Sequence, residues 1–393
     1  MAIYKIFPEK DSTLYSAYPD QNTGLDEILE VSTTFLPDPP QVSRFLIQFD
    51  SNEISDIINN KISGSVTDIT GTLLPESKEF QSNLRCFLAE ISGLNEDTTL
   101  ESFPLFESWS MGTGKFQDNP KTDNGCSWKF RLASGSAPWT TTAFVAKVTG
   151  SYASDNPGGG AWYTGSLGDE NLEVTQSQVL SYKTDKDINL NVTNTIKLFN
   201  SGTISNNGFI VKQSDTQEFQ SDKSKVTNLK YFSFDTNTIY PSHLEFKWRD
   251  FTFNTGSSTN TIINTSQLVA TLANNKEEFI SGSIHKFYIN CSPQFPTRTF
   301  QTSSVYTINF FLPTSSFYAV KDLHTNEFVI DFDTNYTQIS ADEEGSFFKL
   351  FMNGLEPERY YKILIKTNID GNTLILDDDY YFKIINGWVK KYL

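Results

Sequence analysis

Residues 44–50, Arg-Phe-Leu-Ile-Gln-Phe-Asp, indicate the fold class of this 393-residue chain. In an extended strand, Phe45, Ile47 and Phe49 lie on one face and Arg44 and Gln48 lie on the other. A period of two residues is typical of a strand that buries one face in a core. We therefore expect a core β-strand at this position.

The same alternation recurs along the chain, often directly after a turn signal. The pair Asn124-Gly125 precedes residues 126–130, in which Cys126, Trp128 and Phe130 alternate with polar residues. The pattern predicts a strand there, with Trp128 buried between two sheets. Further strands are expected at residues 209–211, 244–248, 286–289, 306–311, 327–330 and 347–351, and a hairpin is expected to join 361–366 to 373–376 around Asp370-Gly371.

Helical signals are few and short. Ser51 precedes isoleucines at helical spacing in a segment that ends near Gly64, and Thr193 precedes a similar segment that ends at Gly202. Short strands separated by turns, without regular intervening helices, favour sandwiches over a parallel α/β sheet. The fold class expected is therefore all-β, with two β-sandwich domains and a few short helices.

A small polar stretch at residues 253–260 follows the aromatic strand at 244–248 and suggests a domain boundary. We predict one domain over residues 1–252 and a second over 261–393. The length of the chain and its 32 Phe, 17 Tyr and 6 Trp residues suffice for two packed cores. Each domain is expected to fold around its own aromatic core.

The charge balance disfavours direct nucleic-acid binding, because 31 Lys and Arg residues face 47 Asp and Glu residues, for a formal charge of −16. No run reaches the roughly 18 apolar residues of a membrane span, so no membrane partner is expected. The first residues show no signal-peptide pattern, and the chain is expected to stay unsecreted. Cys86, Cys126 and Cys291 are odd in number and widely spaced, which favours reduced, buried thiols.

The search for chemistry gives no catalytic, cofactor-binding or metal-binding residues, and no cofactor is expected. His243, His285 and His324 lie far apart and outside any metal-ligand motif. Gly158-Gly159-Gly160 lacks the spacing of a phosphate-binding loop and is expected to be a flexible surface loop. The acidic stretches 118–123 and 377–379 lack the alternating oxygens of a calcium loop and are interpreted as solvated turns.

One pair of aromatic residues could bind a ligand. Trp162 and Tyr163 follow the glycine cluster, and an exposed aromatic face in such a loop suits stacking on a sugar ring. The competing interpretation is that both side chains pack inside the protein. Trp162 and Tyr163 are therefore the candidate contacts to a glycan or a protein partner.

Residues 10–250 resemble the DNRLRE family of β-sandwich domains. The segments that carry the resemblance are Asp11-Ser12-Thr13-Leu14-Tyr15 with Asn22-Thr23-Gly24, then residues 43–50, residues 107–114 followed by 124–128, residues 190–212, and residues 240–248. The paired tryptophan segment around Trp109 and Trp128 is the most specific of these. The resemblance implies a jelly-roll-like sandwich of a kind found in surface and virion proteins.

The C-terminal part resembles an immunoglobulin-like or fibronectin-type sandwich. Leu355-Glu356-Pro357 followed by Tyr361 has the spacing of a tyrosine corner, with Ile363 and Ile365 alternating inward after it. The whole chain, including residues 295–300, also resembles virion structural proteins of large marine tailed phages. That resemblance implies a chain made in the host cytoplasm and located in the virion.

The function expected is a non-enzymatic structural component of a tailed-phage virion, in capsid decoration, the neck, or tail or fibre attachment. Its partners would be other virion structural proteins, with self-association as one option, and it would act by burying surface against them. The first alternative is a module that binds host-surface glycan. A glycan-degrading enzyme, which would need two carboxylates at a defined separation, is the third interpretation.

Overall fold

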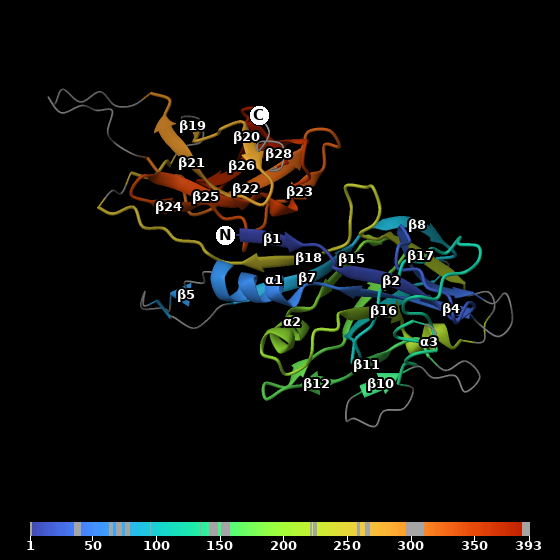
Figure 1. The fold of residues 1–393 in the computed structure, drawn as a ribbon. Helices are drawn as coiled ribbons and strands as arrows, with labels where there is room; N and C mark the ends of the chain where they lie inside the picture. Colours follow the sequence, from blue (N-terminus) through green and yellow to red (C-terminus); the bar gives the residue numbers. More distant parts are fainter. Residues whose placement is uncertain are drawn as a thin grey trace. The chain divides into compact units, whose positions relative to one another are not determined.

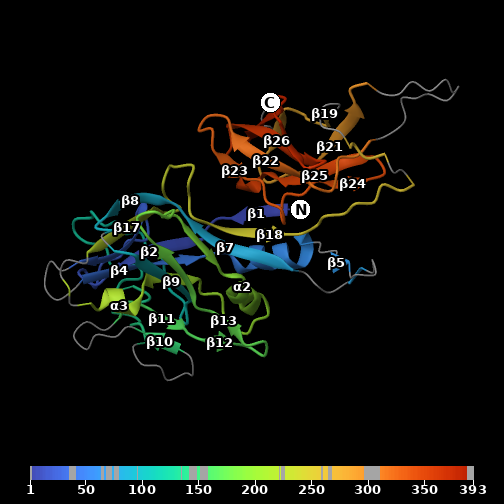
Figure 2. The ribbon, with the colours of Figure 1, turned by 180° about the vertical axis from the view of Figure 1, so that it is seen from behind.

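The computed structural model describes residues 2–34, 41–62, 66–67, 73–74, 79–94, 96–133, 135–140, 148–150, 158–220, 222, 226–257, 260–263, 268–295 and 310–386. The fold is all-β with a few short helices, as predicted (Figures 1 and 2). The chain forms two compact units. The N-terminal unit comprises residues 6–61 and 81–245, and the C-terminal unit comprises 1–5, 62–80 and 246–393.

The N-terminal unit is built mainly from short strands. They are Lys10–Tyr15 (β2), Ile28–Thr34 (β3), Gln41–Gln48 (β4), Leu88–Ser92 (β8), Thr98–Pro104 (β9), Val148–Gly150 (β10), Ala161–Tyr163 (β11), Ser166–Leu167 (β12), Leu172–Glu173 (β13), Gln176–Leu180 (β14), Ile188–Asn191 (β15), Phe209–Gln213 (β16) and Thr227–Phe232 (β17). Within Ala2–Ile6 (β1), Phe80–Cys86 (β7) and His243–Trp248 (β18) the chain passes from one unit to the other.

An eight-stranded sheet forms the main layer of the N-terminal unit, in the order β14-β9-β16-β4-β3-β17-β8, with β2 also paired to β4. The order of a four-stranded sheet is β1-β18-β7-β15. The expected strand at residues 44–50 is β4, and Phe45, Ile47 and Phe49 are buried as predicted. Arg44 is fully buried as well, so both faces of this strand are covered.

The two predicted helices are present. The first is Ser51–Asp56 (α1), which continues as a π-helix over Ile57–Lys61 (η1), and its N-cap is Asp50 rather than Ser51. The Asp50 side chain accepts a hydrogen bond from the backbone N–H of Asn52 and so satisfies a free donor of the first turn. The second is Thr193–Asn200 (α2), and a third short helix, Asp215–Glu218 (α3), was not predicted.

The predicted strand at residues 126–130 is wrong. These residues form an irregular, bent segment in which the backbone N–H of Ser127 donates to the carbonyl of Phe130 at 2.8 Å, and only Phe130 makes an isolated bridge, to Pro138. Trp128 is buried as expected, but it lies on the Arg44 side of β4 rather than between two sheets. Residues 306–309 of the strand expected at 306–311 lie outside the described residues.

The C-terminal unit contains a sandwich of two sheets, coloured orange to red in Figure 1, and a separate two-stranded sheet formed by residues 66–67 and 73–74. Its strands are Val66–Thr67 (β5), Leu73–Leu74 (β6), Leu268–Ala273 (β19), Glu278–Ile280 (β20), Ile284–Pro293 (β21), Ser316–Asp322 (β22), Phe328–Ile330 (β23), Ser340–Asp342 (β24), Gly345–Phe351 (β25), Tyr360–Ile369 (β26), Asn372–Leu376 (β27) and Tyr381–Ile385 (β28), with a 3-10 turn at Met352–Gly354 (η4). One sheet has the order β19-β21-β25-β24, and the other has β20-β28-β26-β22-β23, with β27 paired to β26.

Two local predictions for this unit are confirmed. The hydroxyl of buried Tyr361 donates to the carbonyl of Glu356 at 3.2 Å, which is the contact of a tyrosine corner. The hairpin turns at Asp370 and Gly371, whose φ angles of 50° and 77° are those of a turn that favours Asn, Asp and Gly. The alternating residues Tyr361, Ile363 and Ile365 of β26 lie in the core of this unit.

The division between the units differs from the predicted boundary. Residues 246–252 belong to the C-terminal unit, because Trp248 packs on Phe351 and the backbone of residues 252 and 254 hydrogen-bonds to Ala341 at the end of the same sandwich. Ile3 also belongs to that core. The limits 1–252 and 261–393 stay a prediction for separately folding domains.

Candidate functional site

The candidate contact residues Trp162 and Tyr163 lie in strand β11. Trp162 is only 4% exposed, which agrees with the interpretation that its side chain packs inside the protein, and its ring packs with Phe103 at 5.9 Å between centroids. Tyr163 is half-buried and meets Phe106 edge-on at 5.4 Å. Packing inside the protein therefore describes Trp162, and Tyr163 is packed on one side.

The partner that explains the burial of Trp162 is Arg44. The Arg44 guanidinium lies 5.0 Å from the ring centre of Trp128 and 5.3 Å from that of Trp162. It also forms two hydrogen bonds to the carboxylate of Glu218, at 2.9 and 2.6 Å, and one to the carbonyl of Gly159 at 2.8 Å. These hydrogen bonds and the two aromatic rings offset the cost of removing the guanidinium charge from water.

A second buried cation lies beside this pair. Lys212, in β16, lies with its Nζ 3.5 Å from the Glu218 carboxylate and 2.7 Å from that of Asp215. Glu101, whose carboxylate is 3.7 Å from Lys212, has a raised pKa because burial outweighs the effect of the lysine. The arrangement joins β4, β9, β16 and α3, and its role is to hold the N-terminal unit together.

The glycine cluster is a packed element and not the flexible loop that was expected. Gly158, Gly159 and Gly160 are buried and have φ angles of 134°, 79° and 101°. A Cβ on Gly159 would lie 2.7 Å from the Trp128 ring and 2.9 Å from the Arg44 guanidinium. Glycine is required because the backbone must pass between those groups. Residues 155–157 of the same segment lie outside the described residues.

The segments that carry the family resemblance meet at Asn22. Its buried side-chain amide donates to the carbonyls of Met111 and Cys126, at 2.6 and 2.8 Å, and accepts from the backbone N–H groups of Gly24 and Gly114, at 3.3 and 2.8 Å. All four hydrogen-bonding positions of the amide are filled. This contact joins segments 22–24, 111–114 and 124–126 and is structural.

The histidines and cysteines are not brought together. Among the residues that the structure describes, no group of three or more His, Cys, Asp or Glu side chains could hold a metal ion. All three cysteines are buried and unpaired, and burial raises the pKa of each thiol to about 12. The acidic stretches bind protein donors instead: Asp118 accepts from Thr122, and Asp377 and Asp379 pair with Lys362.

The N-terminal unit contains a groove of about 450 Å³ that sequence reasoning missed. It is lined by residues from β2, β3 and β17, from the loop before β3 and from the loop at 115–117, namely Tyr15, Asp26, Glu27, Ile28, Glu30, Lys115, Phe116, Gln117 and Lys230. Three carboxylates and two aromatic rings define its chemistry. We call this surface the acidic groove.

The cations of the acidic groove are already paired. Lys115 lies 3.6 Å from Glu27, and Lys230 donates to Glu90 at 2.8 Å. Glu30 accepts a hydrogen bond from the Tyr15 hydroxyl at 3.3 Å, and Asp26 accepts from the backbone N–H of Phe116, also at 3.3 Å. Burial raises the pKa of both of these carboxyls, so both would be stabilised as anions by a cation from outside the groove.

The outer side of the six-stranded sheet in the C-terminal unit carries lysines next to aromatic rings, in contrast to the carboxylates of the acidic groove. Phe317 opposes Lys366 across β22 and β26, and Lys321 opposes Phe328 across β22 and β23. The Lys366 ammonium lies 5.6 Å from the Phe317 ring and 4.9 Å from that of Phe332, and Lys321 lies 5.4 Å from Phe328. We call these five residues the lysine-aromatic face. The alternating residues Tyr318 and Val320 point into the core, so this face points away from it.

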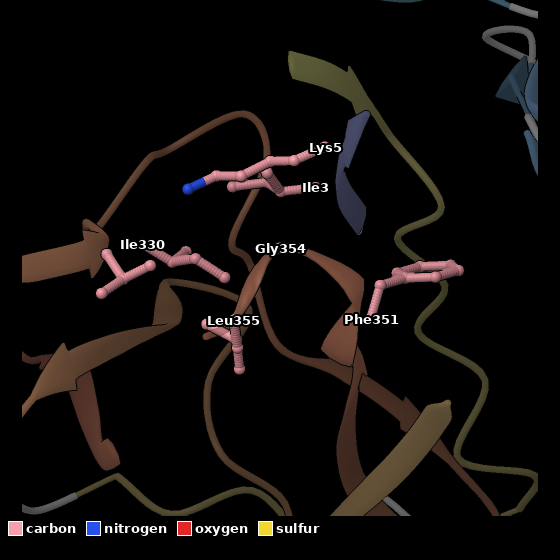
Figure 3. A pocket seen from close by; sticks show the side chains of 7 residues that line it. Ile3, Lys5, Ile330, Phe351, Gly354 and Leu355 are labelled. Atoms are coloured by element: carbon pink, nitrogen blue, oxygen red, sulfur yellow. The ribbon is translucent and has the colours of Figure 1, made fainter. Parts of the chain in front are cut away.

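A second cavity, in the C-terminal unit, is too small to be a ligand site. It is lined by Ile3, Lys5, Val329, Ile330, Phe351, Gly354 and Leu355, and Figure 3 shows how these side chains surround it. Its volume is about 10 Å³, which is the space of a single water at most. We interpret it as a packing void.

Comparison with known proteins found no matching family model, no matching curated protein and no matching solved structure. Within the part of the chain that the structure describes, no helix is long and apolar enough to cross a membrane.

Proposed function

We propose that this chain is a non-enzymatic structural component of a tailed-phage virion that acts through contacts with neighbouring protein chains. The place in the particle is capsid decoration, the neck, or tail or fibre attachment. The resemblance to virion structural proteins and to DNRLRE-type and immunoglobulin-like sandwiches supplies this setting. The two β-sandwich units are in keeping with it.

The observation that carries the proposal is the lysine-aromatic face. An outward sheet face of a protein without partners is ordinarily polar, whereas this sheet exposes Phe328 of β23 by 45% and Ile375, which opposes Lys366 from β27, by 52%. Aromatic residues enriched on a surface are typical of protein-protein interfaces. A surface of this composition favours contact with another chain over catalysis.

The glycan-binding alternative loses its specific support, because the Trp162 ring on which it depended is buried against Arg44. The test of the proposed function is quantitative mass spectrometry of purified particles of the phage that encodes the chain. We expect a fixed copy number per particle that survives high-salt washing. Absence of the chain from particles, together with its abundance in infected-cell lysate, would overturn the proposal.

A further inference from the structure

We propose that copies of this chain associate head to tail, with the lysine-aromatic face of one copy seated on the acidic groove of the next copy. This inference rests on the proposed function and names both the surface and the partner. It commits to a second copy of the chain as the occupant. Contacts of this kind are heterologous, because two different patches meet.

The charge distribution is the first support. The N-terminal unit contains 28 Asp and Glu against 16 Lys and Arg residues, a formal charge of −12 within the −16 of the whole chain. The C-terminal unit supplies the remaining −4, and its lysine-aromatic face presents two cations, Lys321 and Lys366. Opposite potentials on two patches favour encounter and orient the partners.

The local chemistry of the two patches is the second support. Lys321 and Lys366 form no salt bridge among the described residues, whereas their neighbour Lys362 is held by Asp377 and Asp379. Asp26 and Glu30 of the acidic groove likewise form no salt bridge within the described part of the chain. Each patch therefore presents charged groups that contact aromatic rings or hydrogen-bond donors, and that form no salt bridge among the described residues.

The apolar surfaces also match. In the acidic groove, Phe116 packs against Tyr15 at 4.9 Å and against Tyr18 at 5.7 Å between ring centres. On the other patch, Phe328 lies 6.1 Å from Phe332. Burial of the exposed rings of Tyr18 and Phe328 around the charged pairs would supply an apolar contribution that an isolated surface ion pair lacks.

The test uses two variants of the full-length chain, each of which changes one patch. The face variant is Lys321→Glu with Lys366→Glu, and the groove variant is Glu27→Lys with Glu30→Gln. The charge-matched controls at exposed sites outside both patches are Lys183→Glu with Lys276→Glu, and Asp169→Lys with Glu170→Gln. Circular dichroism and the melting temperature establish that each variant is folded, and Glu27→Lys alone replaces the groove variant if Glu30→Gln prevents folding.

Sedimentation velocity over a concentration series at low salt is the measurement. We expect the wild-type chain and both controls to self-associate, with association weakened by salt. Each patch variant alone should stay monomeric. An equimolar mixture of the two should form a dimer and nothing larger, because only one intact face and one intact groove are then available.

Three results would overturn the inference: a wild-type chain that stays monomeric, patch variants that still assemble, or a mixture that gives no dimer. If the wild-type chain stays monomeric and binds glycans on a glycan array, and the groove variant does not bind them, the ligand of the groove is a glycan. These outcomes are distinguishable from failure of the proposed function, which is decided by the content of purified particles.

Discussion

At the scale of single residues, a buried ion pair between Arg44 and Glu218 joins β4 to α3. Arg44 is completely buried, and the rings of Trp128 and Trp162 lie against its guanidinium. A charged residue reaches such a position when another element supplies the counter-charge. Here that element is α3 with Glu218, which lies 174 residues further along the chain.

Loss of the Glu218 charge should destabilise the N-terminal unit strongly. The change Glu218→Gln leaves the Arg44 guanidinium buried without its carboxylate, which costs about 3–5 kcal/mol in the free energy of unfolding. Chemical denaturation of the variant measures this. A double variant, Arg44→Met with Glu218→Gln, should lose less than the sum of the single changes. Strict additivity would show that the two side chains are not coupled.

Trp128 should be similarly sensitive for an apolar reason. Truncation to Ala removes a ring that is 1% exposed and belongs to the same buried cluster as Trp109 and Trp139. The expected cost is about 3–5 kcal/mol in the free energy of unfolding. The exposed Asp378→Ala change is the control and should stay within about 0.5 kcal/mol. Equal small effects of both changes in urea unfolding would show that the position assigned to Trp128 is wrong.

Asp11 should make stability depend on pH near neutrality. Burial, with Asp26 and Asp235 nearby, raises its pKa from an ordinary 3.8 to about 7, against the opposing effect of a hydrogen bond from the Phe234 backbone. Between those two values the folded state holds a proton that the unfolded state has lost. Stability contributed by this group is therefore present at low pH and is lost as pH rises to about 7.

The change Asp11→Asn tests this linkage, because the amide stays neutral at every pH. We expect the variant to be more stable than the wild type above pH 7 and to lack this part of the decline between pH 4 and 7. Melting temperatures across that range measure the effect, and Asp123→Asn, at an exposed carboxyl, is the matched control. An unchanged pH profile would mean that Asp11 is ionised throughout.

At the scale of elements, the predictions succeed where local periodicity and turn chemistry decide the structure. The hairpin around Asp370-Gly371 and α2 with its stop at Gly202 follow from nearest-neighbour signals. The strand prediction for residues 126–130 fails because their backbone N–H groups donate to separate segments, such as Ser110 and Pro19, rather than to one partner strand. The acidic groove was missed because its residues come from three strands and two loops that only the fold brings together.

The tyrosine corner is the element whose contribution can be measured most simply. In Tyr361→Phe the ring stays in the core, while the carbonyl of Glu356 loses its hydrogen bond. We expect a loss of about 1–2 kcal/mol in the stability of the C-terminal unit. Chemical unfolding followed by far-ultraviolet circular dichroism measures this loss. No change in stability would show that the corner does not hold β26.

At the scale of the whole molecule, the position of the division affects how a C-terminal fragment should be cut. A fragment of residues 246–393 retains Trp248 against Phe351, and it retains the backbone bonds of residues 252 and 254 to Ala341. A fragment of residues 261–393 loses all of these contacts. We expect the longer fragment to melt at the higher temperature in calorimetry. Equal melting temperatures would favour the boundary predicted from sequence.

The same scale decides the central claim, that this chain is a structural part of a tailed-phage virion. Cryo-electron microscopy of the intact particle is the most direct measurement. We predict density for both β-sandwich units at a position that repeats with the particle's symmetry, with the lysine-aromatic face against the acidic groove of a neighbouring copy. A well-resolved particle in which no density fits either unit would contradict the account.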